Sequence, residues 1–186
     1  MHLSKRLQKA LLNLSLSVLV ALGLISVPSI ICLAQQTQTA AQKVFPSDFN
    51  MTNVKTNYGA KGDGFTDDTC AIQAALADGR TTNIDYYGRP KALYFPAGTY
   101  LVKDTLEWRG CCLSLQGQGQ GISIIKLKDS SVGFGDRNVP KAVIKTPSGN
   151  MSFRQNISDL SVNTGKNNPG AKGIAFVSSH RINTQN

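Results

Sequence analysis

The most closely spaced acidic residues of the chain are Asp63, Asp67 and Asp68, in the segment GDGFTDD. Neighbouring carboxylates can act as a general acid and a general base, or can bind a hard cation such as calcium. The Asp63-Gly64 pair lacks the alternating acidic spacing of a calcium loop. Asp63 precedes a glycine, as turn formers do, and the other two begin a predicted helix, where carboxylates interact favourably with the dipole. We therefore expect structural roles for all three residues.

Two other motifs have residue types that could carry chemistry. Gly117, Gly119 and Gly121 form the segment GQGQG, but the β-branched residues after it predict a strand, whereas a phosphate-binding loop leads into a helix. These glycines are therefore expected to form a turn. His180 lies near the end of the sequence with no recognisable partner and is expected at the surface. The residues alone assign no catalytic, cofactor-binding or metal-binding position.

The cysteines beyond the amino-terminal leader described below are Cys70, Cys111 and Cys112, an odd number. One thiol must therefore stay free or pair with another chain. Adjacent cysteines on a strand point to opposite faces, so at most one of Cys111 and Cys112 can share a side with Cys70. The spacing lacks a second Cys or His pair for a metal. Small buried thiols are expected rather than a disulfide.

Residues 1–34 have the pattern of a secretory signal peptide. Lys5, Arg6 and Lys9 are cationic, an apolar stretch runs to Val27, and Ala34 supplies a small residue for cleavage. The alternative is an uncleaved membrane anchor, because roughly 20 apolar residues suffice to cross a bilayer. Polar residues and a proline interrupt the stretch, so we favour cleavage and a secreted or periplasmic product. Residues 35–51 are polar and read as a linker, followed by one domain over residues 52–186.

Composition excludes several classes of protein. The 186 residues include 20 Lys and Arg against 11 Asp and Glu, with 41% hydrophobic residues, which excludes a disordered acidic chain and a coiled coil. Removing the leader removes three basic residues, so 17 basic and 11 acidic side chains remain, a net charge of +6. Such a charge either favours binding of an acidic polysaccharide or serves only solubility. Basic residues are not interleaved with aromatics, which argues against nucleic-acid binding.

One helix is predicted near the start of the domain. It should run from Asp67 to about Ala77, with Thr66 as the N-cap and Gly79 as the left-handed stop. Its apolar residues lie on one narrow stripe: Ala71, Ile72, Ala75 and Leu76. A short strand is expected before it, at Asn53 to Thr56.

Short strands dominate the remainder of the sequence. Each predicted strand carries β-branched or large apolar residues between turn residues. They are Ala92–Phe95, Thr99–Val102, Thr105–Trp108, Leu113–Leu115, Ser123–Leu127, Ala142–Lys145, Ile157–Val162 and Gly173–Val177. This all-β pattern fits either a sandwich of hairpins or a parallel β-helix. Both Asp-Gly pairs flank the predicted helix and do not join two strands, which favours the β-helix.

Two segments resemble the amino-terminal end of the pectate-lyase superfamily. They are VKTNYGAKGDGFTDDTCAIQAAL at Val54–Leu76 and LYFPAGTYLV at Leu93–Val102. This superfamily includes rhamnogalacturonases, polygalacturonases, exo-β-1,3-glucanases and some phage tail spikes. Leu113–Leu127 and Asn156–Val177 look like the next coils and lean toward the glucanase-like branch. The resemblance covers nearly the whole predicted domain.

The resemblance implies a right-handed parallel β-helix, of which this chain holds the first few coils, with the Asp67 helix as an amino-terminal cap. It also implies a polysaccharide partner, pectin-like or β-glucan, and a glycoside hydrolase or lyase activity. We expect no cofactor. The stretch Arg80 to Lys91 is longer than the usual link, and its Tyr86 and Tyr87 could stack on a sugar. Catalytic residues of such enzymes lie on middle coils, so none can be carried onto this sequence.

Two functional interpretations follow. The chain is either an amino-terminal portion of a secreted polysaccharide-processing enzyme, or a non-catalytic module that binds extracellular glycan or assembles through an open last coil. An open coil exposes unpaired strand groups, which another domain or another chain would cover.

Overall fold

The computed structural model describes residues 51–78, 91–147, 152–177 and 183–185. The chain divides into two compact units, Met1–Ala41 and Gln42–Asn186, and all described residues belong to the second. The predicted signal peptide, the tyrosine pair and His180 lie outside the described residues. Among the described residues, no helix has the length and apolar composition needed to span a membrane.

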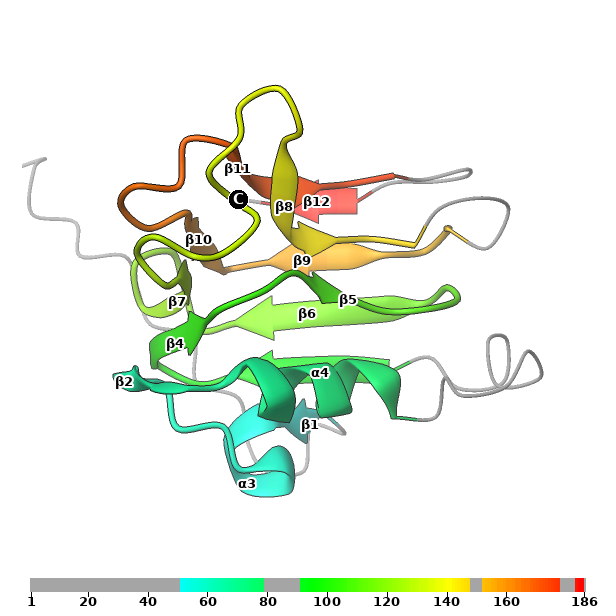
Figure 1. The fold of residues 1–186 in the computed structure, drawn as a ribbon. Helices are drawn as coiled ribbons and strands as arrows, with labels where there is room; N and C mark the ends of the chain where they lie inside the picture. Colours follow the sequence, from blue (N-terminus) through cyan, green and yellow to red (C-terminus); the bar gives the residue numbers. More distant parts are fainter. Residues whose placement is uncertain (1–50, 79–90, 148–151, 178–182, 186) are drawn as a thin grey trace, which may run out of the picture. The chain divides into compact units, whose positions relative to one another are not determined.

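The strands of the second unit form three sheets, which we call sheets A, B and C (Figure 1). Sheet A contains β1 (Thr52–Asn53), β3 (Lys91–Phe95), β6 (Leu113–Gly117), β9 (Asn156–Ser158) and β12 (Asn183–Gln185). Sheet B contains β2 (Asp63–Asp67), β4 (Gly98–Val102), β7 (Ser123–Leu127) and β10 (Ser161–Asn163). Sheet C contains β5 (Leu106–Glu107), β8 (Lys141–Lys145) and β11 (Ala171–Ala175).

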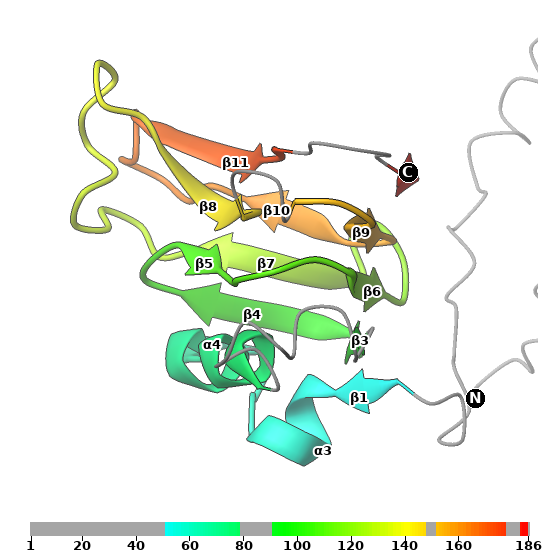
Figure 2. The same ribbon diagram turned by 90° about the vertical axis from the view of Figure 1, so that its right-hand side faces the viewer.

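All strand pairs among the described residues are parallel, and each strand pairs with its counterpart in the next turn of the chain. The chain visits sheets A, B and C in that order and then begins again one level further along (Figure 2). This is the parallel β-helix that the sequence favoured. The alternative of a sandwich of hairpins is wrong, because a hairpin would pair neighbouring strands antiparallel.

Apolar rows fill the space between the sheets. In sheet A, Leu93 pairs with Leu115, and Leu115 pairs in turn with Ile157. In sheet B, Tyr100 pairs with Ile125. All five side chains are buried. Strands β6 and β7 alternate buried and half-buried residues because successive side chains point to opposite faces of a strand. Stacked coils thus continue one hydrophobic core.

Helix α4 (Thr69–Ala77) occupies the first coil beside β5. Its stripe is as predicted, with Ile72, Ala75 and Leu76 buried and Ala71 packed against the core. The side chain of Gln73 donates to the carbonyl oxygen of Glu107 and accepts from the amide of the same residue. The helix therefore satisfies backbone groups at the edge of β5, where an open sheet would leave them unpaired.

The start of this helix differs from the prediction. Asp67 is the last residue of β2, where it pairs with Leu101, so α4 begins at Thr69 with Asp68 as its N-cap. The carboxylate of Asp68 does not cap the helix but accepts from the amides of Lys61 and Gly62. Tertiary hydrogen bonds thus override the helix-start pattern of the two aspartates.

Two predicted strands also change. The predicted strand at Asn53–Thr56 is mostly helix α3 (Val54–Tyr58), because the Asn53 side chain accepts from the amides of Lys55 and Thr56. The predicted strand Ile157–Val162 is divided into β9 and β10 by Asp159, which has a φ of 54°. That left-handed residue turns the chain from sheet A to sheet B.

Candidate functional site

A pocket of about 450 Å³ opens beside sheet C. Residues from three consecutive coils line it, because β5, β8 and β11 are neighbours in this sheet. The lining residues are Asp104, Thr105, Glu107, Pro140, Lys141, Ala142, Lys145, Lys172 and Ala175. Two are acidic and three are basic, so the pocket carries a formal excess of one positive charge.

Strand register places the charged side chains of the pocket. Glu107 pairs with Lys145, and Lys145 pairs with Ala175 on the next coil. Lys172 lies on β11, the strand next to β8, where it pairs with Ala142. Neighbouring strands are about 4.8 Å apart, so these residues fall within a short distance along the β-helix.

Two ion pairs cross the pocket. Lys141 Nζ lies 2.5 Å from Asp104 Oδ1, and Lys145 Nζ lies 3.5 Å from Glu107 Oε2. The side chains are 38–61% exposed, so each pair contributes no more than about 1 kcal/mol to stability. Their main effect is to orient the two ammonium groups. Lys172 is exposed and forms no ion pair with any described residue.

The environment of Asp104 keeps its carboxylate charged. The hydrogen bond from the Lys141 ammonium lowers the pKa of Asp104, and partial burial opposes this. The amide of Thr105 also donates to Asp104 Oδ1 and lowers the pKa further. Asp104 is therefore an anion at neutral pH and is not a proton donor there.

The chemistry that this arrangement supports is recognition of an anion beside a small apolar surface. The lysines supply ammonium donors, while Ala142, Ala175 and Pro140 leave room for a ring to approach. Among the described residues, no group of three or more His, Cys, Asp or Glu side chains could hold a metal ion. The lysines and the small apolar residues make the pocket a candidate anion-binding site.

The acidic cluster near the amino terminus lies elsewhere and binds the chain's own backbone. Asp63 Oδ1 accepts from the amides of Phe65 and Thr66, which, with the Thr66 hydroxyl, lower its pKa to about 2. Asp67 accepts from Thr69 and pairs with Lys103 at 3.0 Å. Asp63 thus has the predicted role of a turn former, whereas Asp67 lies in β2 and the Asp68 carboxylate accepts from the amides of Lys61 and Gly62.

The three glycines of GQGQG also lie where a turn was expected. Gly117 ends β6, and Gly119 and Gly121 lie between β6 and β7. No helix follows them, as the sequence indicated.

The expectation of small buried thiols is wrong for Cys111 and Cys112, which form a disulfide with each other. They lie in the loop between β5 and β6, not on a strand, so their side chains do not have to point apart. Cys112 has a φ of 67°, a conformation that the sequence did not reveal. The expectation of burial is also wrong for Cys70, a free and exposed cysteine on α4.

Sequence reasoning missed the pocket residues. Asp104, Lys141 and Lys172 are far apart along the chain and belong to no motif. Only the register of the coils brings them together, so the signal would have been a correct alignment of the coils with one another.

Comparison with known proteins agrees with the fold. A family profile described as rhamnogalacturonase A/epimerase, pectate lyase-like, matches residues 51–186. The chain belongs to this family. The match includes every strand described above and confirms the superfamily that the sequence resembled.

Proteins similar to this chain come from fungi, bacteria and viruses. The chain is 32% identical over 126 residues to mannuronan C5-epimerase AlgE5 of Azotobacter vinelandii, covering 64% of this chain and 11% of that protein. It is 33% identical over 122 residues to alginate lyase 7 of the same organism, covering 62% and 13%. The solved structure of ORF18 of Geobacillus virus E2 matches with a TM-score of 0.51 and 29% identity, covering 67% of this chain and 23% of that one. The chain thus spans a small part of the length of these proteins.

Proposed function

We propose that the pocket on sheet C binds an acidic polysaccharide and that the chain serves in polysaccharide processing. The observation that carries this proposal is the convergence of Lys141, Lys145 and Lys172 from two adjacent coils on one pocket. Family membership supports it, and so do relatives named for mannuronan and alginate, which are polymers of uronic acids.

The pocket suits a chain of uronate residues in two ways. The carboxylates Asp104 and Glu107 hold Lys141 and Lys145 in place before a ligand arrives, so less side-chain entropy is lost on binding. Lys172 has no ion-pair partner among the described residues and is available to a ligand carboxylate. The affinity should fall as salt is added, because the contacts are exposed charges.

Asp104 does not suit the acid of a hydrolytic carboxylate pair. A glycoside hydrolase needs one carboxylic acid that stays protonated near neutral pH, and its pKa is raised. The pKa of Asp104 is lowered instead. Asp104 therefore does not fit the role of that acid, and the second candidate function is a glycan-binding module without turnover.

The test measures binding of the full chain to oligomannuronate and to a neutral β-1,3-glucan oligomer of equal length. Lys172→Gln and Lys145→Gln should each weaken oligomannuronate binding by about tenfold, the loss expected for a charge-assisted contact. Lys126→Gln is the matched control, because Lys126 lies on β7 in sheet B. Equal binding of the neutral glucan, or an equal loss in the control, would overturn the proposal.

The same samples separate processing from binding alone. Appearance of unsaturated or reducing sugar ends, or conversion of mannuronate to its C5 epimer, supports processing by this chain. Retention of the polysaccharide without any of these products supports the binding module.

We also propose export of the chain, with cleavage after Ala34 and a mature product that begins at Gln35. The cationic and apolar pattern of residues 1–34 supports this. The Cys111–Cys112 disulfide is the bond type that persists outside the cytosol. The intact mass of the product from an expressing culture tests the proposal, and a product that retains Met1 would contradict it.

A further inference from the structure

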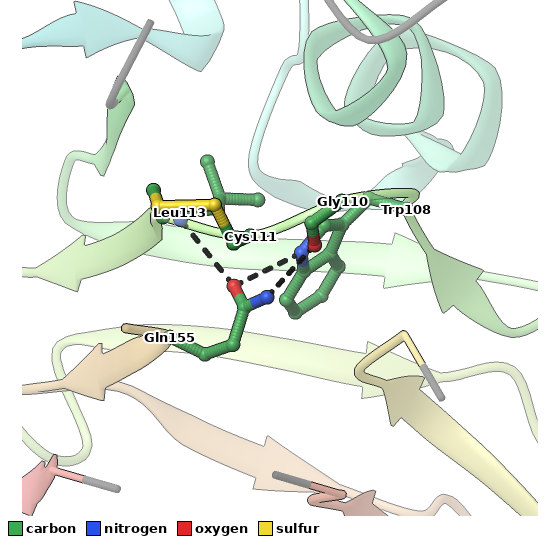
Figure 3. The surroundings of a disulfide bond; sticks show 6 residues. Trp108, Gly110, Cys111, Leu113 and Gln155 are labelled. Atoms are coloured by element: carbon green, nitrogen blue, oxygen red, sulfur yellow. Dashed lines mark hydrogen bonds between the residues drawn. A yellow bond between two sulfur atoms is a disulfide. The ribbon is translucent and has the colours of Figure 1, made fainter. Parts of the chain in front are cut away.

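The loop between β5 and β6 is held from the next coil by one buried glutamine (Figure 3). Gln155 Oε1 accepts from the indole Nε1 of Trp108 at 3.1 Å and from the amide of Leu113 at 3.3 Å. Its Nε2 donates to the carbonyl oxygen of Gly110 at 2.9 Å. Gln155 is 1% exposed, so its amide group depends on this loop for its hydrogen bonds.

The disulfide lies inside the same loop. Cys111 is 1% exposed, whereas Cys112 is half-buried. The amide of Cys112 donates to the carbonyl oxygen of Phe153 at 3.1 Å, a second contact with the next coil. The disulfide therefore lies between Gly110 and Leu113, whose backbone groups bond Gln155, and one of its own amides bonds Phe153.

The backbone of this loop adopts left-handed conformations that need support. Gly110 has a φ of 77°, which glycine adopts freely. Cys112 has a φ of 67°, which is uncommon for a residue with a Cβ atom. The covalent ring between adjacent residues restricts Cys112 to a small set of conformations, so opening the ring removes that restriction.

The disulfide is expected to contribute little to the stability of the whole fold. A disulfide stabilises mainly by restricting the unfolded chain, and the effect grows with the length of the loop that it closes. Adjacent cysteines close the shortest possible loop. The apolar row of Leu93, Leu115 and Ile157 is paired strand to strand without either cysteine.

We propose that Cys111 and Cys112 form a reversible redox site that sets the conformation of the loop from Trp108 to Cys112. A dithiol reductant is the co-reactant. Its thiolate attacks the Sγ of Cys112, the more exposed of the two cysteines, the Sγ–Sγ bond breaks, and Cys111 leaves as a thiolate that takes up a proton. The second thiol of the reductant then displaces Cys112 as a thiol, so two electrons and two protons pass to the pair and the reductant becomes a disulfide.

Opening of the ring should be visible at Trp108. With the ring open, Cys112 can leave its left-handed conformation, which breaks the bond to Phe153 and displaces the Leu113 amide from Gln155. Gln155 Oε1 also accepts from the indole of Trp108, so a shift of Gln155 changes the environment of that indole. Trp108 is the single tryptophan of the sequence, so its fluorescence reports on this loop alone.

The experiment titrates the full chain, carrying Cys32→Ser and Cys70→Ser, with a dithiol reductant. Those substitutions leave only the two cysteines of the disulfide. We expect release of both thiols, a red shift of Trp108 emission with the same midpoint, and amide exchange at Leu113 faster by about tenfold or more. Far-UV circular dichroism should stay unchanged, and reoxidation should restore the emission. Adding Cys111→Ser and Cys112→Ser should give the shifted emission without reductant.

Three results would overturn the proposal. Release of both thiols with unchanged Trp108 emission and Leu113 exchange would show that the bond does not set the loop conformation. Loss of the β-sheet signal in far-UV circular dichroism at the same midpoint would show that the disulfide stabilises the whole fold. Failure to release thiols from the folded chain would show a bond that is closed to reduction. The titration of the native pair gives an answer even where the double serine variant does not fold.

Discussion

Acidic side chains of the first coil stabilise backbone turns, and this role can be tested at single residues. Asp63 was identifiable from sequence because an Asp-Gly pair is a local turn signal that needs no tertiary information. Asp67 was misplaced because its position depends on pairing of β2 with β4, which no local pattern records. Asp104 was missed for the same reason, since its partner Lys141 lies on another coil.

Asp63→Asn should make the free energy of unfolding less dependent on pH in the acidic range. The folded pKa of Asp63 is about 2, below the unfolded value of about 3.9, so its charged form stabilises the fold above about pH 4. That contribution is lost as pH falls through about 2. Urea unfolding of both chains should show a deficit in the variant at pH 7 that narrows below about pH 4. A deficit that is the same at every pH would contradict this account.

The elements stabilise one another through the contact of each coil with the next. The helix stripe and most strands were predictable, because apolar periodicity is written in the local sequence. The break between β9 and β10 was not predicted, because aspartate adopts a left-handed φ, here 54° at Asp159, far less often than glycine does. The α3 helix was also missed, since five residues are too few to show a helical period.

Gly117→Ala should disturb the contact between coils. A Cβ atom at Gly117 would lie 2.0 Å from the carbonyl oxygen of Asp159 on the next coil, so the backbone must move. We expect a loss of about 1–3 kcal/mol in the free energy of unfolding, as for other overpacked sites. Gly135→Ala is the matched control, because nothing lies within 4 Å of the added atom. Equal denaturation midpoints for the two variants would refute the packing argument.

Leu115→Ala should test the row of apolar residues that the coils share. Leu115 is 1% exposed and pairs with Leu93 on one side and Ile157 on the other. The cavity should cost about 2–5 kcal/mol in chemical denaturation. Ser114→Ala, on the same strand at a half-buried position, should change stability by less than about 0.5 kcal/mol. A small effect at Leu115 would mean that the rows do not stack as described.

At the scale of the whole molecule, stacking of coils creates the pocket on sheet C. Its charged residues come from three coils, and none belongs to a motif that the sequence displays. The fold class could be predicted because turn residues and short strands recur along the chain. The site could not be, because the number of residues between equivalent strands varies, so the register between coils is fixed only by packing.

The most direct test is hydrogen–deuterium exchange of the full chain with and without oligomannuronate. The account predicts slower amide exchange in β5, β8 and β11, with no change in β3 and β6 of sheet A, and loss of the protection in Lys172→Gln. Protection confined to sheet A or sheet B, or protection of sheet C that survives Lys172→Gln unchanged, would contradict the assignment of sheet C as the polysaccharide-binding face.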